Sequence, residues 1–440
     1  EHDPLELIEK LNILIDNIIK KIPSKNILSV GITNQRESVI VWDKTNGKPI
    51  YNTIVWQCKR TKKQCNELSE KYKTTVFNKT GLYIDSYFSA TKIKWIIDNC
   101  KNTKKLIKQN KILCGTIDTW IIWNLTNRKK HITDFTNASR TMLYNINDKK
   151  WDNDLLEIFN IPKSILPEVK NSSDSFGKIQ NINIKINSVM GDQQAALYGH
   201  GAFNINSSKC TYGTGLFFLI NSGKRRIDSK NGLITTLACD QLGQAVYAIE
   251  GSIFIGGALI QWLRDKLQII TKASETEKIA LSVNNTNGVY IVPAFSGLGA
   301  PYWNPECRGI ITGLTGAASK KHIIRASLES ICYQINDLLN SIKKDTKINI
   351  KELNVDGGAT NNKFLMQFQS DISNINILKP KNIESTALGV AIMSGLQSNL
   401  WKTAKEAFSY KKADKIYKPK MESIDRNDKL TGWKKALKKL

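Results

Sequence analysis

Residues 184–197 have the sequence IKINSVMGDQQAAL, and this stretch decides the fold class that the sequence predicts. Its first seven residues predict a strand, Gly191 predicts a break, and the residues from Asp192 onward predict the start of a helix. Proteins that alternate strands and helices place their sites beyond the carboxyl ends of strands. Asp192 therefore has two interpretations: a helix N-cap worth ~1 kcal/mol, or a carboxylate that accepts a proton from a substrate hydroxyl.

The same arrangement recurs at three other places along the chain. A predicted strand at 27–32 precedes the polar group Asn34–Glu37, and a predicted strand at 353–355 precedes the glycines of 356–358 and a helix. Residues 210–220 predict two strand pieces bent at a Gly-Thr-Gly turn. Each signal has an ordinary explanation as a tight turn or a surface ion pair. Each also suits a site, because glycine turns expose backbone N–H groups that can hold phosphate.

Hydrophobic patterns elsewhere predict alternating helices and strands. In the first half we expect helices over 7–18, 60–72 and 90–99, and strands over 39–42, 50–56 and 112–122. The first two of these strands are joined through an Asn46-Gly47 turn. In the second half we expect helices over 255–265 and 320–342 and from residue 362. The alternation predicts two α/β lobes that meet near residue 203.

Composition excludes several classes of protein. The 440 residues suffice for two or three domains with buried cores. The formal charge of +25 comes from diffuse lysines without a nucleic-acid-binding motif, so we interpret it as a solvated surface with weak, nonspecific affinity for polyanions. The apolar stretches are shorter than the ~20 residues of a membrane helix. Eight cysteines without a Cys-x-x-Cys pair and four dispersed histidines favour a cytoplasmic protein with reduced thiols and no structural metal.

A series of short motifs, none of them specific alone, occurs in a specific order along almost the whole chain. They are GITNQRE at 31–37, IVWQ at 54–57, YFSATKIKW at 87–95, TNASRTM at 136–142, GDQQAA at 191–196, TYGTG at 211–215, GIITGL at 309–314, DGG at 356–358 and FLMQFQ at 364–369. In this order the motifs resemble the FGGY family of carbohydrate kinases. The chain has neither a Walker-type loop nor a Gly-x-Gly-x-x-Gly fingerprint.

The resemblance implies a fold and a reaction. The fold is α/β, with two actin-like, ribonuclease-H-like ATPase lobes and an active-site cleft between them. Residues 1–202 would form a polyol-binding N-terminal domain and residues 203–440 a nucleotide-binding C-terminal domain. The implied reaction is the ATP-dependent, Mg²⁺-assisted phosphorylation of glycerol to sn-glycerol 3-phosphate in glycerol catabolism. Two alternatives stay open: a catalytically impaired fragment that still binds glycerol or ADP, and an actin-like assembly protein switched by a nucleotide.

The resemblance also implies candidate site residues. A small polyol needs hydrogen-bond donors and acceptors around its hydroxyls, and the residues implied to bind it are Arg36, Glu37, Trp56, Tyr87, Asp192 and Gln193. Asp192 would act as general base and is the candidate ligand of the Mg²⁺ that accompanies ATP. The residues implied to bind ATP or ADP are Thr214, Gly257, Gln261, Gly358 and Asn362, with Asn361 competing for the last position.

The sequence departs from the family pattern at two places. Family members begin with a strand and an Asp-x-Gly-Thr-Thr-Ser turn that grips the transferred phosphoryl group and its Mg²⁺, and this sequence starts downstream of that turn. Residues 176–185 lack a Gly/Arg-rich insertion that serves as a sugar-phosphate effector site in some bacterial relatives. The resemblance further implies a homo-oligomer, either a dimer or a tetramer, with no specific nucleic-acid partner and no integral membrane association.

Overall fold

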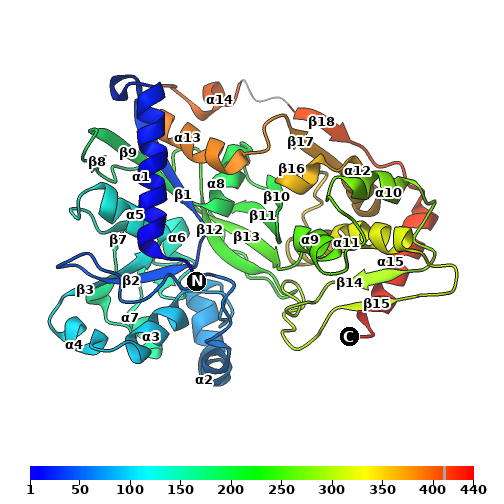
Figure 1. Cartoon of the computed structure of the whole chain (residues 1–440), viewed down its shortest axis with the longest axis horizontal. Coiled ribbons are helices and arrows are strands. Elements are labelled where there is room, and N and C mark those ends of the chain that lie inside the picture. The colour runs from blue at the N-terminus through cyan, green and yellow to red at the C-terminus, as the bar shows by residue number, and fades with distance from the viewer. Residues whose placement is uncertain (410–412) are drawn as a thin grey trace.

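A computed structural model describes residues 1–409 and 413–440 of the chain as a mixed α/β structure (Figure 1). Its helices are α1 Pro4–Lys21, α2 Lys62–Thr80, α3 Ala90–Asn99, α4 Thr103–Lys108, α5 Ile117–Leu125, α6 Phe135–Ala138, α7 Asn153–Phe159, α8 Asp192–Gly199, α9 Gly257–Asp265, α10 Glu275–Leu281, α11 Lys320–Thr346, α12 Lys363–Ser373, α13 Ser385–Gln397, α14 Ala404–Ala407 and α15 Ser423–Leu437. Its strands are β1 Ser29–Asn34, β2 Val39–Asp43, β3 Ile112–Thr116, β4 Ile132–Asp134, β5 Tyr144–Asn145, β6 Lys150–Trp151, β7 Glu168–Lys170, β8 Lys178–Ile179, β9 Ile184–Gly191, β10 Ser208–Tyr212, β11 Leu216–Gly223, β12 Ile234–Cys239, β13 Ala245–Ile253, β14 Tyr290–Val292, β15 Ile310–Thr312, β16 Glu352–Asp356, β17 Asn376–Pro380 and β18 Ala413–Tyr417.

The larger sheet lies in the second half of the chain and has the strand order β12-β13-β11-β10-β16-β17-β18. The two strand pieces predicted over 210–220 are β10 and β11, which pair antiparallel, while β10 runs parallel to β16. The carboxyl ends of β10 and β16 therefore lie side by side. The backbones after them come so close that a Cβ on Gly357 would lie 2.5 Å from the carbonyl oxygen of Tyr212, and Gly357 has a φ of +89°. Only glycine fits there. This close approach of the two backbones places the turn at 213–215 beside the turn at 357–358.

A second, three-stranded sheet has the strand order β1-β9-β8, and β1 runs parallel to β9 with Asn34 opposite Gly191. The residues that follow these two strands leave the sheet at the same edge. Parallel pairing in this register brings 35–37 next to 192–193, which the sequence separates by more than 150 positions. The sheet therefore assembles one polar group from two distant motifs.

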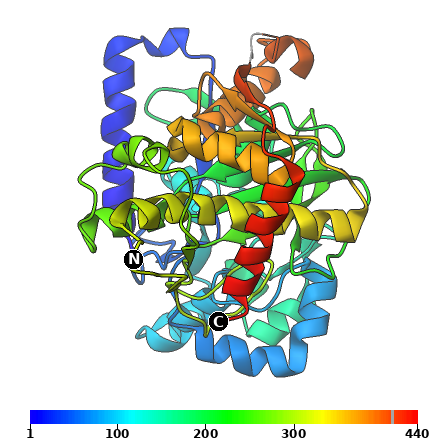
Figure 2. The same cartoon turned by 90° about the vertical axis from the view of Figure 1, so that its right-hand side faces the viewer.

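Helices from the second half of the chain pack on both sheets. α13 lies against β1 and β9, where Ser188 Oγ donates a hydrogen bond of 2.8 Å to the carbonyl oxygen of Val390. In Figure 2, α15 crosses in front of the long helix α11. The rings of Tyr333 and Trp433 stack at this crossing with centroids 5.2 Å apart. The last third of the chain therefore contributes to the packing of both halves.

Several predicted elements are confirmed. α1 begins at Pro4, and the Asp3 carboxylate caps it by accepting a hydrogen bond of 2.8 Å from the N–H of Leu5. α3 occupies 90–99 as predicted. β9 and α8 meet as residues 184–197 predict, but the N-cap of α8 is Gly191 and no side chain caps this helix. The interpretation of Asp192 as a helix N-cap is therefore wrong, because Asp192 is already the first helical residue.

Two of the predicted strands are wrong. Over 112–122 the strand ends at Thr116 and α5 follows. Helical spacing places Trp120 and Trp123 on one side, where their ring centroids lie 5.2 and 6.1 Å from that of Trp42, so burial of large rings decides the local structure. Residues 50–56 form isolated bridges instead of a strand: Ile54 pairs with Val39 of β2, and Thr53 pairs with His2.

Two further properties of the described residues concern their helices and their cysteines. None of the helices in residues 1–409 and 413–440 has a stretch long and apolar enough to span a bilayer. All eight cysteines fall within these residues and are free thiols, six of them buried. Burial raises the pKa of the Cys65 thiol to about 11, which keeps it protonated near neutral pH.

Candidate active site

The turn after β1 places Arg36 and Glu37 inside the protein, where each is 2% exposed. Glu37 has a φ of 62°, a left-handed conformation that a non-glycine residue adopts at a cost in energy. Its carbonyl oxygen accepts hydrogen bonds from Ser89 Oγ at 3.2 Å and from Lys92 Nζ at 3.1 Å. These two donors hold the strained backbone in place.

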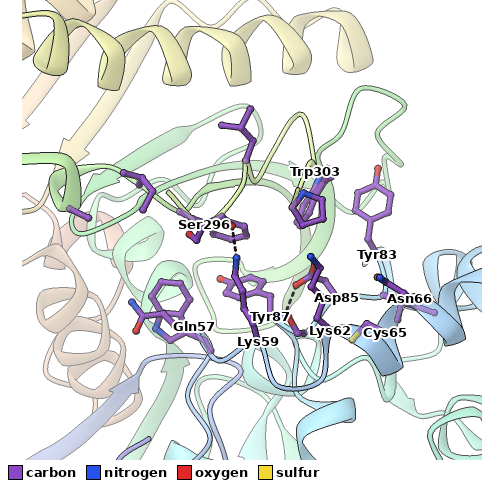
Figure 3. Close-up of a pocket in the computed structure, with 18 of the residues that line it drawn as sticks. Gln57, Lys59, Lys62, Cys65, Asn66, Tyr83, Asp85, Tyr87, Ser296 and Trp303 are labelled. Atoms are coloured by element: carbon purple, nitrogen blue, oxygen red, sulfur yellow. Dashed lines mark hydrogen bonds between the residues drawn. The ribbon is translucent and has the colours of Figure 1, made fainter. Parts of the chain in front are cut away.

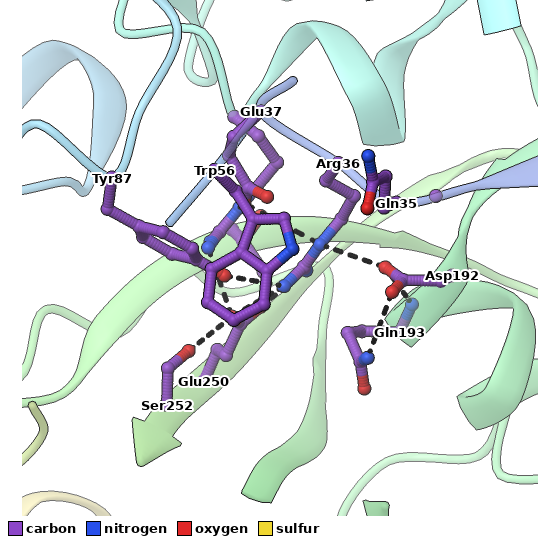
Figure 4. Close-up of polar contacts among 12 residues, drawn as sticks. Gln35, Arg36, Glu37, Trp56, Tyr87, Asp192, Gln193, Glu250 and Ser252 are labelled. Carbon is purple, nitrogen blue, oxygen red and sulfur yellow. Dashed lines mark hydrogen bonds and ion pairs between the residues drawn. The ribbon is translucent and has the colours of Figure 1, made fainter. Parts of the chain in front are cut away.

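The Arg36 guanidinium lies at the centre of a hydrogen-bonded cluster (Figure 4). Its Nη1 and Nη2 donate to the two carboxylate oxygens of Glu250 at 2.7 and 2.8 Å, a bidentate pair. Nη1 also donates to Gln194 Oε1 at 3.2 Å, and Nη2 lies 3.5 Å from the Tyr87 hydroxyl. Its Nε lies 3.3 Å from Asp192 Oδ1. The guanidinium is therefore fixed on one side and faces Asp192 on the other.

Asp192 carries a partly exposed carboxylate at the start of α8, with 32% of its side chain exposed. Its Oδ1 accepts a hydrogen bond of 2.8 Å from the N–H of Gln193, and its Oδ2 accepts one of 3.2 Å from Gln193 Nε2. The Gln193 side chain in turn accepts a hydrogen bond from Lys209 Nζ. The carboxylate is held in position and remains accessible, as a proton acceptor for a bound hydroxyl must be.

A cavity of about 540 Å³ opens beside this cluster (Figure 3). Trp56, Tyr87 and Thr214 lie in its lining. The Trp56 ring meets those of Tyr87 and Phe217 edge to face, at centroid distances of 5.7 and 5.9 Å. The structure therefore brings all the residues implied to bind the polyol into one region, with Trp56 and Tyr87 in the cavity lining and the other four in the adjoining cluster.

A second cavity, of about 520 Å³, is formed between β10, α9 and α12. Its lining contains every residue implied to bind the nucleotide: Thr214, Gly257, Gln261, Gly358, Asn362 and the competing Asn361. The Asn362 side chain caps α12 by accepting a hydrogen bond of 2.9 Å from the N–H of Leu365. Thr214 lines both cavities, so the two spaces meet at this residue.

The lining of the second cavity fits a nucleotide. A Cβ on Gly358 would meet no atom within 4 Å, so the backbone here borders open space that a ligand can approach closely. The Thr214 hydroxyl, the Gln261 amide and the Arg264 guanidinium supply donors. Among residues 1–409 and 413–440, no group of three His, Cys, Asp or Glu side chains could hold a metal ion.

Family models match most of the chain. The model for the N-terminal domain of the FGGY family of carbohydrate kinases matches residues 1–199, and the model for its C-terminal domain matches residues 208–398. The chain belongs to the FGGY family of carbohydrate kinases. Family membership confirms the predicted fold of two actin-like, ribonuclease-H-like ATPase lobes, and it confirms that the protein is a kinase.

Named relatives of this FGGY kinase are similar over its whole length. Glycerol kinase from Clostridium botulinum (strain 657 / Type Ba4) is 52% identical, in an alignment that covers 100% of this chain and 90% of the relative. Glycerol kinase 1 from Clostridium tetani is 50% identical with the same coverage. The crystal structure of Plasmodium falciparum glycerol kinase with ADP is similar with a TM-score of 0.92 and 41% identity, over 100% of this chain and 90% of that one. A xylulose kinase from Lactobacillus acidophilus, at 22% identity and a TM-score of 0.84 over 98% and 86% of the two chains, shares the fold.

Three buried side chains of this FGGY kinase belong to the cluster but are absent from the residues that the sequence implied. Arg140 Nε donates to Glu37 at 2.6 Å, and Glu250 accepts from both arginines of the cluster. Lys209 donates to Gln193 and, at 2.8 Å, to Thr211 Oγ1. Arg140 lies in the TNASRTM motif and could have been selected from it. The signal for Glu250 and Lys209 is weaker: each is a charged residue inside a predominantly buried strand.

Burial and neighbouring charges decide the protonation of the cluster. Burial raises the pKa of Glu250, but the charges of Arg140 and Arg36 lower it further, to about 2. Glu250 is therefore anionic at neutral pH. For Glu37 burial is the larger effect, and its pKa is raised. Burial lowers the pKa of Lys92 to about 8. Two carboxylates that both accept from Arg140 thus have opposite pKa shifts.

Proposed function

We propose that this kinase transfers the γ-phosphoryl group of ATP to a terminal hydroxyl of glycerol and forms sn-glycerol 3-phosphate. One observation carries the proposal: Thr214 lines both cavities, so an acceptor beside Trp56 and Tyr87 meets a nucleotide beside Gly358. Glycerol as the acceptor is supported by relatives named glycerol kinase at 52% and 50% identity. The ADP in the solved structure of a glycerol kinase at 41% identity supports an adenine nucleotide as the second substrate.

The residues proposed to bind glycerol contact different parts of it. The Arg36 guanidinium and the Gln193 amide donate to hydroxyl oxygens, and the Glu37 carboxylate accepts from hydroxyl protons. The Trp56 ring packs on the carbon backbone of the polyol. The Asp192 carboxylate accepts the proton of the attacking hydroxyl, a role that contributes typically ~10²–10⁴ in rate. The position of Asp192 beside Arg36 Nε, at 3.3 Å, supports this division.

The nucleotide residues position the phosphates. Thr214 supplies a hydroxyl, and the backbone at Gly257 and Gly358 allows the phosphates to come close, while Gln261 and Asn362 complete the lining. Mg²⁺ that accompanies ATP would neutralise the charge that develops on the transferred phosphoryl group, and Asp192 is its candidate protein ligand. Closure of the lobes around both substrates would exclude water as a competing acceptor.

The proposed function is tested by measuring ADP release with glycerol, xylulose and gluconate as acceptors and with ATP alone. We expect the highest kcat/KM with glycerol, since relatives that are 52% and 50% identical to this chain are named glycerol kinase. ADP release without an acceptor is the control for ATP hydrolysis. Faster turnover of xylulose or gluconate than of glycerol would contradict the assignment.

The two alternatives from the sequence gain no support. A protein that only binds glycerol or ADP would not need an accessible carboxylate beside the acceptor cluster, as Asp192 is. An actin-like assembly protein would not need the polyol-binding residues. The relatives and solved structures described above are all named as kinases of glycerol or a sugar.

The organisation of the protein is also part of the proposal. We place the domain boundary near residue 203, with 1–202 as the polyol-binding domain and 203–440 as the nucleotide-binding domain, since the seven-stranded sheet begins at Ser208. The eight free thiols support a cytoplasmic location. A homo-oligomer, dimer or tetramer, is supported by the apolar side chains of α1 that are about half exposed, Ile13, Leu14 and Ile18. Sedimentation analysis tests this state, and a monomer at all concentrations would contradict it.

A further inference from the structure

Four buried charges form a closed ring that includes two of the acceptor residues. Figure 4 labels three of the four, Arg36, Glu37 and Glu250. Arg36 Nη1 donates to Glu250 Oε2 at 2.7 Å, and Glu250 Oε1 accepts from Arg140 Nη2 at 3.0 Å. Arg140 Nε donates to Glu37 Oε1 at 2.6 Å, and this oxygen lies 3.6 Å from Arg36 Nε. None of the four residues is more than 2% exposed, and their formal charges cancel. We call Arg36, Glu37, Arg140 and Glu250 the charge ring.

The charge ring joins segments that are far apart in the chain. Arg36 and Glu37 follow β1, and Arg140 follows α6. Glu250 lies within β13 of the seven-stranded sheet, 214 positions from Arg36. The C-terminal family model matches the segment with Glu250, and the N-terminal family model matches the segments with the other three. Through Glu250, the second half of the protein holds acceptor residues of the first half.

Two nitrogen donors of the charge ring make no hydrogen bond. Arg36 Nε and Arg140 Nη1 are buried and have no hydrogen-bond partner within residues 1–409 and 413–440. A buried donor without a partner is costly, so such donors are rare in folded proteins. Arg36 Nε lies 3.3 Å from Asp192 Oδ1, beside the proposed general base. This nitrogen is thus ion-paired with the carboxylate of the proposed general base, which links the charge ring directly to the acceptor site.

Stability alone does not account for the charge ring. Buried ion pairs are on average no more stabilising than apolar side chains of the same volume, because both charges lose their water. One member of the ring, Glu37, also has a left-handed backbone conformation, with a φ of 62°. Strained residues of this kind concentrate at functional sites, where the surroundings determine their position. The ring has the properties of a support for a binding site.

We propose that Glu250 and Arg140 are positioning residues of the acceptor site: they hold the Arg36 guanidinium and the Glu37 carboxylate in the orientation that binds glycerol. The inference rests on glycerol being the acceptor, as proposed above. Glu250 and Arg140 act through their partners and do not themselves contact the polyol. Loss of either residue therefore weakens acceptor binding and leaves nucleotide binding and turnover at saturating glycerol largely intact.

The variant Glu250→Gln tests the proposal, because it keeps the shape of the side chain and removes its charge. We expect the KM for glycerol to rise by about 10- to 100-fold, the usual effect of losing hydrogen bonds to a charged group. We expect kcat at saturating glycerol and the KM for ATP to change by less than ~3-fold. The lost interaction stabilises bound glycerol equally in the ground state and in the transition state, so its loss does not slow the chemical step. Glu250→Asp, which keeps the charge on a shorter side chain, should recover part of the affinity.

Glu329→Gln is the matched control. Glu329 on α11 is 1% exposed and accepts hydrogen bonds from Arg325 Nε at 2.9 Å and from the Tyr333 hydroxyl at 3.1 Å. It is thus an equally buried, ion-paired carboxylate outside the charge ring. We expect this control variant to be destabilised and to keep the glycerol KM of the wild type, whereas Glu250→Gln changes that KM.

A second variant keeps the proposal testable if Glu250→Gln does not fold. Arg140→Lys keeps the charge, but a single ammonium group cannot reproduce the donation from Nε to Glu37 and from Nη2 to Glu250. We expect it to raise the KM for glycerol by at least about 10-fold. A folded variant of either kind with a glycerol KM within ~3-fold of the wild type would overturn the proposal, as would an equal rise of both KM values. A wild-type protein that does not phosphorylate glycerol would instead refute the proposed function, before any variant is made.

Discussion

Asp192 and Gly358 illustrate how differently single residues are held on the two sides of the site. The Asp192 carboxylate is fixed by two donors of Gln193 and by the nearby Arg36 guanidinium. Gly358 has no atom within 4 Å of the position that a Cβ would take. A substitution at Asp192 therefore changes a functional group whose position is fixed by its neighbours. A substitution at Gly358 instead adds a side chain to an open space.

Replacement of Asp192 by asparagine should separate catalysis from binding. The amide of Asn keeps an oxygen for the N–H of Gln193 but cannot accept a proton at neutral pH. We expect the KM for glycerol to stay near the wild-type value and kcat to fall by ~10²–10⁴. Steady-state kinetics measure both values. A turnover number close to that of the wild type would leave Asp192 with a structural role.

Replacement of Gly358 by alanine should weaken nucleotide binding without weakening the fold. The added methyl group meets no protein atom within 4 Å but enters the space proposed for the phosphates. Calorimetric titration should show that the Kd for ADP rises by about 10-fold or more. The free energy of unfolding, measured by thermal denaturation, should change by no more than ~0.5 kcal/mol. Gly316→Ala is the control, because a Cβ there also meets nothing within 4 Å and Gly316 is outside both cavities. Equal ADP affinity in the two variants would place the nucleotide elsewhere.

At the scale of elements, α5 and the strands around it show how side-chain packing selects secondary structure. α5 follows β3 directly, and its tryptophans pack on Trp42 of β2. The imidazole of His131, just before β4, completes this packing with its ring edge on to that of Trp42 at 5.5 Å. His131 Nε2 lies 2.8 Å from the carbonyl oxygen of Cys114 in β3. A titratable group is therefore enclosed where three elements meet.

His131 should make the stability of the protein depend on pH below neutrality. Burial lowers the pKa of His131 from 6.5 to about 4. Between these values the unfolded chain binds a proton that the folded protein does not, so stability is lost as the pH falls through this window. We expect the wild type to lose about 2 kcal/mol more than His131→Gln between pH 6.5 and pH 5. Urea unfolding at the two pH values measures the free energy of unfolding of each protein. An equal loss of this free energy in the wild type and in His131→Gln would show that protonation of His131 does not destabilise the folded protein.

The segment 176–185 gives a second prediction at the scale of elements. It contains the two-residue strand β8, which pairs antiparallel with β9 across a short turn, and Phe176 is fully buried. The segment lacks the Gly/Arg-rich insertion of some relatives. Fructose 1,6-bisphosphate should therefore not inhibit the enzyme through this segment. An inhibition curve that disappears when Lys178 and Lys185 are both replaced by alanine would contradict the prediction.

At the scale of the whole molecule, the formal charge of +25 governs contacts with polyanions. Nothing in the proposed function uses nucleic acid, so binding should depend on charge and salt alone. We expect duplexes of unrelated sequence to bind equally weakly at low salt and to be released by ~0.2 M salt. Fluorescence anisotropy with two duplexes of different sequence measures this. A preference for one duplex that persists at the higher salt would reveal a specific partner.

The sequence alone predicted much of the fold and most of the candidate site. Local signals were sufficient where strand, turn and helix follow one another within a few residues, as at 184–197 and at 210–220. Local signals failed at 112–122, because three distant rings, those of Trp42, Trp120 and Trp123, outweigh the β propensity of the segment. The order of the motifs then identified the family, and with it the candidate residues on both sides of the cleft.

The tertiary structure alone decided which side chains support that site. Sequence placed Asp192 after a strand, but the parallel register of β1 and β9 brought it beside Arg36. Glu250 could not be paired with Arg36 from a sequence in which 214 positions separate them. The physical reason is that backbone propensity and hydrophobic periodicity act over a few residues, whereas a buried charge is tolerated only where the folded chain supplies its counter-charges. The fold class followed from local patterns, and the charge ring followed from the packing of two sheets.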